Sequence, residues 1–115
     1  MRIAISGTHR VGKSTLIEEL GASLPGYRIV REPYELLEER GYEFAYPPTV
    51  EDFIAQLKQS LALLRRPVRN VLFDRCPLDF IGYILATRGG ERFDIERWRT
   101  PIAEAIASLD LLAFI

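Results

Sequence analysis

The sequence predicts an α/β fold, a three-layer α/β/α sandwich with a parallel sheet. Short apolar segments alternate with helical segments along the whole chain, and this order favours parallel strands joined by helices. Residues 71–73 are apolar without alternation, as expected for a strand that is buried on both faces. A chain of 115 residues, 48% of them hydrophobic, is long enough to form one domain around a substantial core.

Chain-breaking residues set the bounds of the first three expected elements. Residues 1–6 form an apolar strand, and the helix after the next loop keeps apolar residues at helical spacing until Pro25. Residues 27–32 form the second strand. This strand ends before Pro33, because a proline restricts the residue before it to extended conformations.

A short helix, a loop and a long helix follow. The short helix covers residues 34–40, and the loop over residues 41–49 carries three aromatic residues. We expect two of them to pack against the long helix, although they could also stack on a flat ligand. The long helix is apolar along one face, with Thr49 as its expected N-cap, and it ends before Pro67.

The last part of the chain repeats the pattern of strand and helix. Residues 68–74 form the third strand, and Pro77 suits the first position of the helix that follows. The last helix, over residues 94–108, contains Pro101, so we expect it to be kinked or divided in two. The apolar residues 111–115 are the fourth strand.

Charge and composition exclude several classes of protein. Fifteen basic residues against 16 acidic residues give a net charge of -1, which argues against binding to a nucleic-acid polymer. The sequence has no run of 18 apolar residues and no signal peptide, so we expect no contact with membranes. Its single cysteine excludes a disulfide framework within the chain. We therefore expect a protein of the reducing cytoplasm.

Residues 7–14, GTHRVGKS, match the phosphate-binding pattern G-x-x-x-x-G-K-S/T. The glycines let backbone N–H groups point at phosphate oxygens, Lys13 would contact the β- and γ-phosphates, and the Ser14 hydroxyl would bind Mg²⁺. No N-K-x-D guanine signature occurs, so ATP is favoured over GTP. The candidate nucleotide-binding residues are Gly7, Thr8, His9, Arg10, Val11, Gly12, Lys13, Ser14 and Thr15.

Two carboxylates follow the predicted strands where a ligand should bind. Glu32 ends the second strand and Asp74 ends the third, and open α/β sheets bind ligands beyond the carboxyl ends of their strands. Each would lie roughly 5 to 10 Å from the phosphate-binding loop. Either could orient or deprotonate an acceptor, and Asp74 could also bind Mg²⁺. The alternative for Glu32 is a surface ion pair with Arg31. The alternatives for Asp74 are an ion pair with Arg75 or a cap of the helix that begins at Pro77.

Three motifs, GTHRVGKST, VREP and FDRCPLDF, resemble those of the P-loop nucleoside and nucleotide kinase group, including the AAA-like ATP-binding proteins. The resemblance spans nearly the whole chain. It implies a fold of P-loop NTPase type and a small-molecule phosphoacceptor such as a nucleoside or nucleotide. It also implies that Glu32 acts on the acceptor hydroxyl and that Arg75 steadies the acceptor or the transferring phosphoryl group. The candidate catalytic residues are Lys13, Glu32, Asp74 and Arg75.

The resemblance also raises the question of what the chain lacks. Such kinases continue past the fourth strand into a lid helix with catalytic arginines, which these 115 residues do not contain. We therefore expect a single domain over residues 1–115, truncated after the fourth strand, with residues 111–115 as a buried strand. The alternative function is an ATP-binding or ATP-hydrolysing switch that has no small-molecule acceptor.

Overall fold

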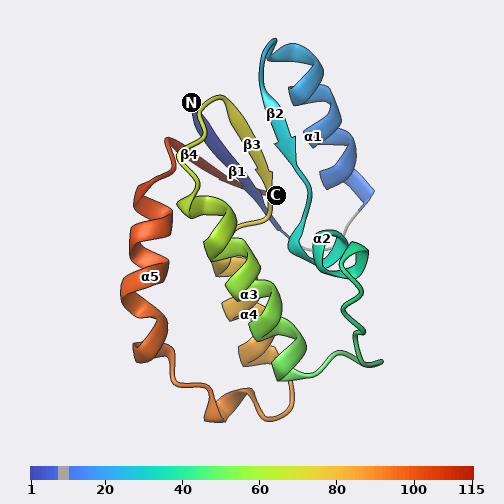
Figure 1. Ribbon diagram of the computed structural model, residues 1–115, viewed down its shortest axis with the longest axis vertical. Helices are drawn as coiled ribbons and strands as arrows, with labels where there is room; N and C mark the ends of the chain where they lie inside the picture. The colour runs from blue at the N-terminus through green and yellow to red at the C-terminus, as the bar shows by residue number, and fades with distance from the viewer. Residues whose placement is uncertain (8–10) are drawn as a thin grey trace.

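The structure is a computed structural model that describes residues 1–7 and 11–115. Within these residues, four parallel strands form one sheet in the order β2-β3-β1-β4. Helices precede or follow each strand, as Figure 1 shows. The strands are β1 (Arg2–Ser6), β2 (Arg28–Val30), β3 (Val71–Asp74) and β4 (Leu111–Phe114). The helices are α1 (Val11–Ser23), α2 (Pro33–Glu39), α3 (Val50–Arg65), α4 (Pro77–Ala86) and α5 (Ile95–Ala107), with a short 3-10 helix over Gly90–Arg92.

The elements form the three layers that the sequence predicts. Helix α1 covers one face of the sheet, where Ile17 packs against Ile3 and Ile5 of β1. Helices α3, α4 and α5 contribute to the core on the other face. The described part of the chain contains no helix that is long and apolar enough to span a membrane.

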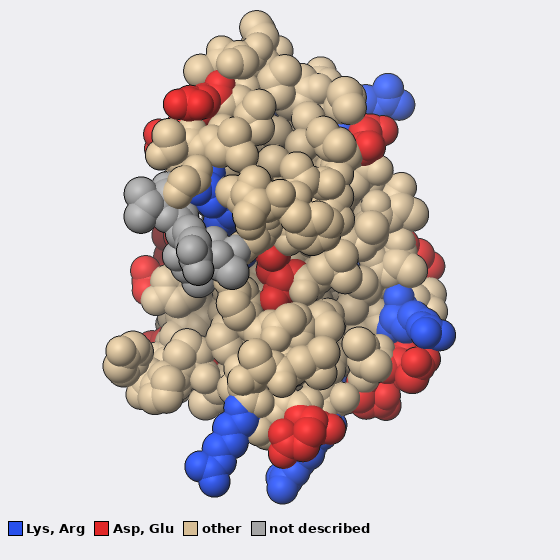
Figure 2. Space-filling view, turned by 180° about the vertical axis from the view of Figure 1, so that it is seen from behind, with Lys and Arg blue, Asp and Glu red and all other residues tan. Residues whose placement is uncertain are grey.

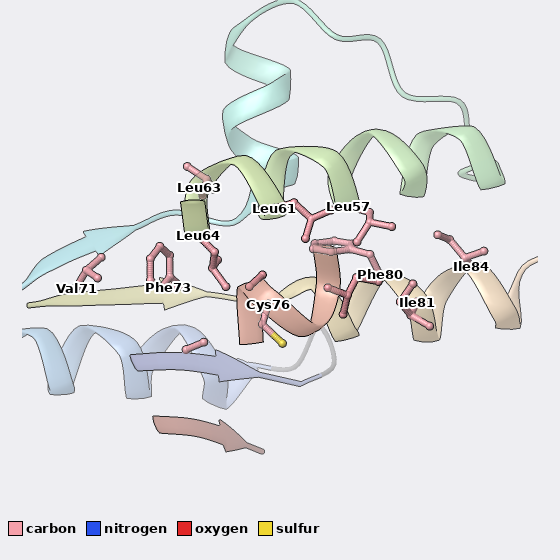
Figure 3. Close-up of a cluster of buried hydrophobic side chains, with 13 residues drawn as sticks. Leu57, Leu61, Leu63, Leu64, Val71, Phe73, Cys76, Phe80, Ile81 and Ile84 are labelled. Atoms are coloured by element: carbon pink, nitrogen blue, oxygen red, sulfur yellow. The ribbon is translucent and has the colours of Figure 1, made fainter. Parts of the chain in front are cut away.

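The larger core lies between β3 and the helices α3 and α4 (Figure 3). Val71 and Phe73 of β3 belong to this core, whereas Leu72 between them belongs to the smaller core under α1. Successive side chains of a strand point to opposite faces of the sheet. All three are at most 3% exposed, which confirms that β3 is buried on both faces.

Local signals predict the starts of two helices. Pro77 is the first residue of α4, as expected. Helix α2 begins at Pro33, one residue before the expected start at residue 34, because a proline also suits the first position of a helix. Thr49 is the N-cap of α3, where its hydroxyl accepts a hydrogen bond from the Asp52 N–H at 3.3 Å. The Asp52 carboxylate accepts one from the Thr49 N–H at 2.9 Å. This reciprocal pair is a capping box, which satisfies two N–H groups that the helix leaves unpaired.

The aromatic loop is attached to two helices. The Tyr42 hydroxyl donates a hydrogen bond to Asp52 of α3 at 2.9 Å, as expected for a loop that packs on the long helix. Phe44 instead stacks on Tyr34 of α2, with ring centroids 4.4 Å apart. Tyr46 is 99% exposed.

Two expectations for the end of the chain need correction. Helix α5 continues through Pro101 as one helix, which excludes the division into two and leaves a kink as the remaining expectation. Strand β4 is not buried, because it lies at the edge of the sheet and pairs with β1 alone among the described strands. Leu111 is 49% exposed and Phe114 is 67% exposed. Apolar composition indicated a strand but could not show whether a second neighbour covers it.

The strand order determines where a ligand can bind. The connection from β1 leads past β3 to β2, whereas the connection from β3 leads past β1 to β4. The order therefore reverses between β1 and β3, and the crevice at such a point is the usual ligand site of open α/β sheets. Ile5 pairs with Asp74 in the sheet register, so both strands end at this crevice.

Candidate functional site

The phosphate-binding pattern begins at Gly7, directly after β1, and its last four residues form the first turn of α1. Gly7 follows β1 with φ +153°, and a Cβ there would lie 2.6 Å from the carbonyl oxygen of Ile115. A larger residue therefore does not fit at this position. Thr8, His9 and Arg10 lie outside the described residues.

The first residues of α1 present open polar groups to this crevice. The backbone of Val11 starts the helix, and Gly12, Ser14 and Thr15 are exposed. A Cβ at Gly12 would meet no described atom within 4 Å, and Gly12 is exposed. An accessible helix N-terminus carries unpaired N–H groups and a partial positive charge, both of which favour phosphate.

Lys13 brings the two predicted carboxylates together. Its side chain is 4% exposed, and its Nζ atom forms an ion pair with Oδ1 of Asp74. The same Nζ atom lies 3.6 Å from Oε2 of Glu32. Both carboxylates therefore lie closer to the phosphate-binding lysine than the strand spacing predicts, because the lysine side chain extends toward them.

Arg75 also contacts the carboxylate of Glu32. Its Nε atom donates to Oε2 of Glu32 at 3.1 Å, and its side chain is 1% exposed. Its guanidinium also donates to the carbonyl of Gly7 at 2.6 Å and to the hydroxyl of Tyr83 at 3.1 Å. The backbone of Arg75 is left-handed, with φ +83°. Such a conformation is unfavourable outside glycine and is frequent at functional sites.

The alternative pairings with sequence neighbours do not occur. Arg31 forms a two-bond ion pair with Glu39 on the surface, with distances of 2.5 and 2.7 Å. The hydrogen bond between them raises the pKa of Arg31 and lowers the pKa of Glu39. Asp74 pairs with Lys13 rather than with the adjacent Arg75. Asp74 ends β3 as expected, whereas Glu32 does not end β2, because that strand stops at Val30 and Glu32 is the N-cap of α2. Both carboxylates nevertheless contact Lys13.

Asp79 is a structural residue of the site that sequence reasoning missed. Its Oδ1 atom accepts from the Ser6 hydroxyl at 2.5 Å and from the Gly7 N–H at 3.1 Å. Its Oδ2 atom accepts from the Cys76 N–H at 2.9 Å. One side chain thus joins the start of α4 to the end of β1. The signal in the sequence was an acidic residue two positions after Pro77, which is typical of a capping box.

Cys76 packs in the core. It is fully buried, and burial raises the pKa of its thiol. A high pKa keeps the sulfur protonated and weakly nucleophilic.

The oxygen donors at the crevice fit Mg²⁺ as a partner of nucleotide phosphates. Ser14 offers an exposed hydroxyl and Asp74 a carboxylate, and Mg²⁺ prefers one or two protein oxygens together with phosphate oxygens. No group of three or more His, Cys, Asp or Glu side chains that could hold a metal ion occurs within residues 1–7 and 11–115. Figure 2 shows a small basic patch and a small acidic patch near the middle of the back face.

The comparison with known proteins agrees with this geometry. A family model described as an AAA domain matches residues 2–106, a range that includes Lys13, Glu32, Asp74 and Arg75. No curated protein matches the chain. The match covers most of the sequence, and the motif at residues 7–14 lies at the expected place between a strand and a helix. The chain therefore belongs to the AAA domain family of nucleotide-binding P-loop NTPases.

Proposed function

We propose that this chain is an ATP-dependent phosphotransferase that acts on a small molecule with a hydroxyl group. The observation that carries the proposal is the position of Glu32. Its carboxylate contacts Lys13 of the phosphate-binding motif on one side and lines a cavity of about 560 Å³ on the other. A group in this position can touch both the phosphate donor and an acceptor.

The nucleotide side of the site follows from Lys13. Without nucleotide, its ammonium group is paired with Asp74 and lies near Glu32. When ATP binds, we expect the ammonium group to contact the β- and γ-phosphates instead. Ser14 and Asp74 would hold Mg²⁺, which neutralises charge on the phosphates.

The acceptor side gives the two carboxylates different roles. Glu32 lines the cavity of about 560 Å³, and Asp74 is absent from its described lining. We therefore assign Glu32 to the acceptor and Asp74 to the metal. The acceptor oxygen forms a bond to the γ-phosphorus while the bond from that phosphorus to the β-γ bridging oxygen breaks. The acceptor proton passes to Glu32, and ADP is the leaving group.

Arg75 is then a positioning residue. It holds Glu32 at 3.1 Å and fixes the carbonyl of Gly7 at 2.6 Å. One guanidinium thus connects the acceptor carboxylate to the start of the phosphate-binding loop. This arrangement holds the nucleotide side and the acceptor side of the site in a fixed relative position. Phosphoryl transfer depends on such positioning.

The test measures transfer of labelled γ-phosphate from Mg-ATP to a panel of alcohols, nucleosides and nucleotides. Glu32→Gln keeps the shape of the side chain but removes the base, so we expect kcat to fall roughly 100-fold or more with ATP still bound. Glu39→Gln is the matched control, because Glu39 pairs with Arg31 on the surface. Unchanged turnover in Glu32→Gln would exclude the assigned role. Slow hydrolysis of ATP without transfer to any acceptor would favour a nucleotide-dependent switch instead.

A further inference from the structure

We propose that the cavity beside Glu32 accepts a flat aromatic alcohol that carries a positive charge and no phosphate. The inference rests on the proposed function, because it takes this cavity as the acceptor site. At about 560 Å³ the cavity has the size of ordinary small-molecule sites. Its walls come from α2, α3 and α4 and from the residue before α2.

The charge of the lining is negative. Glu32, Glu35 and Glu38 all line the cavity, and no Lys or Arg does so within the described residues. Glu32 is balanced by Lys13 and Arg75. Glu35 and Glu38 form no salt bridge with any described residue, and Arg31, which also interacts electrostatically with Glu35, is paired with Glu39. Two carboxylates of α2 therefore remain to attract a cation and repel a phosphate.

The walls are aromatic. The rings of Phe53 and Tyr83 stack with centroids 5.3 Å apart and an angle of 17° between their planes. Tyr34 also lines the cavity. Its hydroxyl donates a hydrogen bond to Glu38, which raises the pKa of the Tyr34 phenol. Aromatic faces favour flat ligands, and their negative faces favour cations in particular.

The amide of Gln56 gives the cavity a polar contact. Gln56 of α3 lines the cavity and is 6% exposed. Its amide oxygen can accept a hydrogen bond and its amide nitrogen can donate one. The side chain can therefore pair with a ring that carries its own donor or acceptor.

A phosphorylated acceptor would need cations, and no Lys or Arg among the described residues lines this cavity. Lys58, Arg88, Arg92 and Arg97 line a separate cavity of about 980 Å³, which shares Pro48 and Phe53 with the first but does not include Glu32. A molecule in the cavity beside Glu32 therefore meets the carboxylates of Glu35 and Glu38 rather than these cations. The charge of the lining favours a cationic acceptor over an anionic one.

The test measures binding to the full chain by calorimetry without ATP, so that it is independent of phosphoryl transfer. The probes are two cations, 3-methylcytidine and 3-(hydroxymethyl)-1-methylpyridinium, with cytidine and 3-methylbenzyl alcohol as neutral analogues and CMP as the anion. We expect each cation to bind at least threefold more tightly than its neutral analogue and CMP to bind most weakly. We expect Glu35→Gln with Glu38→Gln to weaken binding of the cations roughly three- to tenfold and to leave the neutral analogues unchanged.

The matched control replaces Glu91 and Glu104, two exposed carboxylates outside the cavity, by glutamine and should leave all affinities unchanged. Binding of CMP in preference to the cations, failure of both cations to bind, or an equal loss of all ligands in the double variant would overturn the inference. Glu32-dependent transfer of phosphate to a neutral or anionic acceptor would overturn this inference but support the proposed function. Binding of the cations without any transfer would instead count against the proposed function.

Discussion

Arg75 and Glu32 are separated by 43 positions in the sequence, and their side chains form a largely buried ion pair with an Nε to Oε2 distance of 3.1 Å. The pair joins the residue after β3 to the N-cap of α2, which lies two residues beyond the end of β2. It forms because the backbone of Arg75 turns into a left-handed conformation directly after the strand. The position of the proposed acceptor carboxylate therefore depends on an unfavourable backbone conformation that the side-chain contacts of Arg75 stabilise.

Two substitutions of Arg75 separate the contribution of its ion pair from the cost of its left-handed backbone conformation. Arg75→Ala removes the ion pair and keeps a Cβ at positive φ, so we expect the free energy of unfolding to fall by about 3 kcal/mol. Arg75→Gly removes the same contacts but accepts the backbone conformation, so it should be about 1 kcal/mol more stable than Arg75→Ala. Urea denaturation measures the free energy of unfolding of both variants. Equal stability of the two variants would show that the left-handed conformation costs nothing at this position.

Asp79 is expected to hold the start of the phosphate-binding loop in place. Asp79→Asn replaces one acceptor oxygen by an amide donor, which cannot accept from Ser6, Gly7 and Cys76 together. We expect a loss of roughly 1 to 3 kcal/mol in unfolding free energy and weaker binding of ATP. Asp94→Asn is the control, because Asp94 precedes α5 without a side-chain capping bond. If both variants behave alike, Asp79 has no special role.

The capping box of α3 predicts a dependence of stability on acid pH. Burial alone would raise the pKa of Asp52, but hydrogen bonds from Thr49, Tyr42 and Ala45 outweigh burial and lower it below its ordinary value of 3.8. A depressed pKa in the folded state means that the contribution is present above about pH 4 and is lost as the pH falls through the folded value.

Asp52→Asn should therefore destabilise the protein by about 1 to 2 kcal/mol at pH 7 and by less as the pH falls toward 2. Urea midpoints at a series of pH values measure this convergence. Glu51→Gln, a change at the exposed neighbouring residue, serves as the control and should leave the acid dependence unchanged. A constant gap between wild type and Asp52→Asn at every pH would contradict the assigned contribution of Asp52.

Most of the fold could be predicted because its signals are local. Pro77 marks a helix start, Thr49 marks a cap, and an apolar run marks β3. The phosphate-binding motif was also predictable, because its function depends on residue types at fixed spacing. Glu32 and Asp74 were found because strand ends in a parallel sheet meet at one edge.

The remaining contacts of the site depend on how distant segments meet. Ser6 and Asp79 are 73 positions apart, and no local pattern predicts their hydrogen bond. The choice of Glu32 rather than Asp74 as the partner of Arg75 likewise depends on the backbone turn after β3. The exposure of β4 depends on its place at the sheet edge, which strand composition does not determine.

The measurement that tests the account most directly is calorimetric titration of ATP into the wild type and Lys13→Met, with and without Mg²⁺. Lys13 is buried beside Asp74 and Glu32 at the switch point of the sheet, and its charge should bind the phosphates. We expect saturable, Mg²⁺-dependent binding to the wild type and a loss of roughly 10- to 100-fold in affinity in Lys13→Met. Lys58→Met, a change at an exposed lysine of α3, should bind as the wild type does. Absence of Mg²⁺-dependent binding to the wild type, or equal affinity in Lys13→Met, would contradict the account.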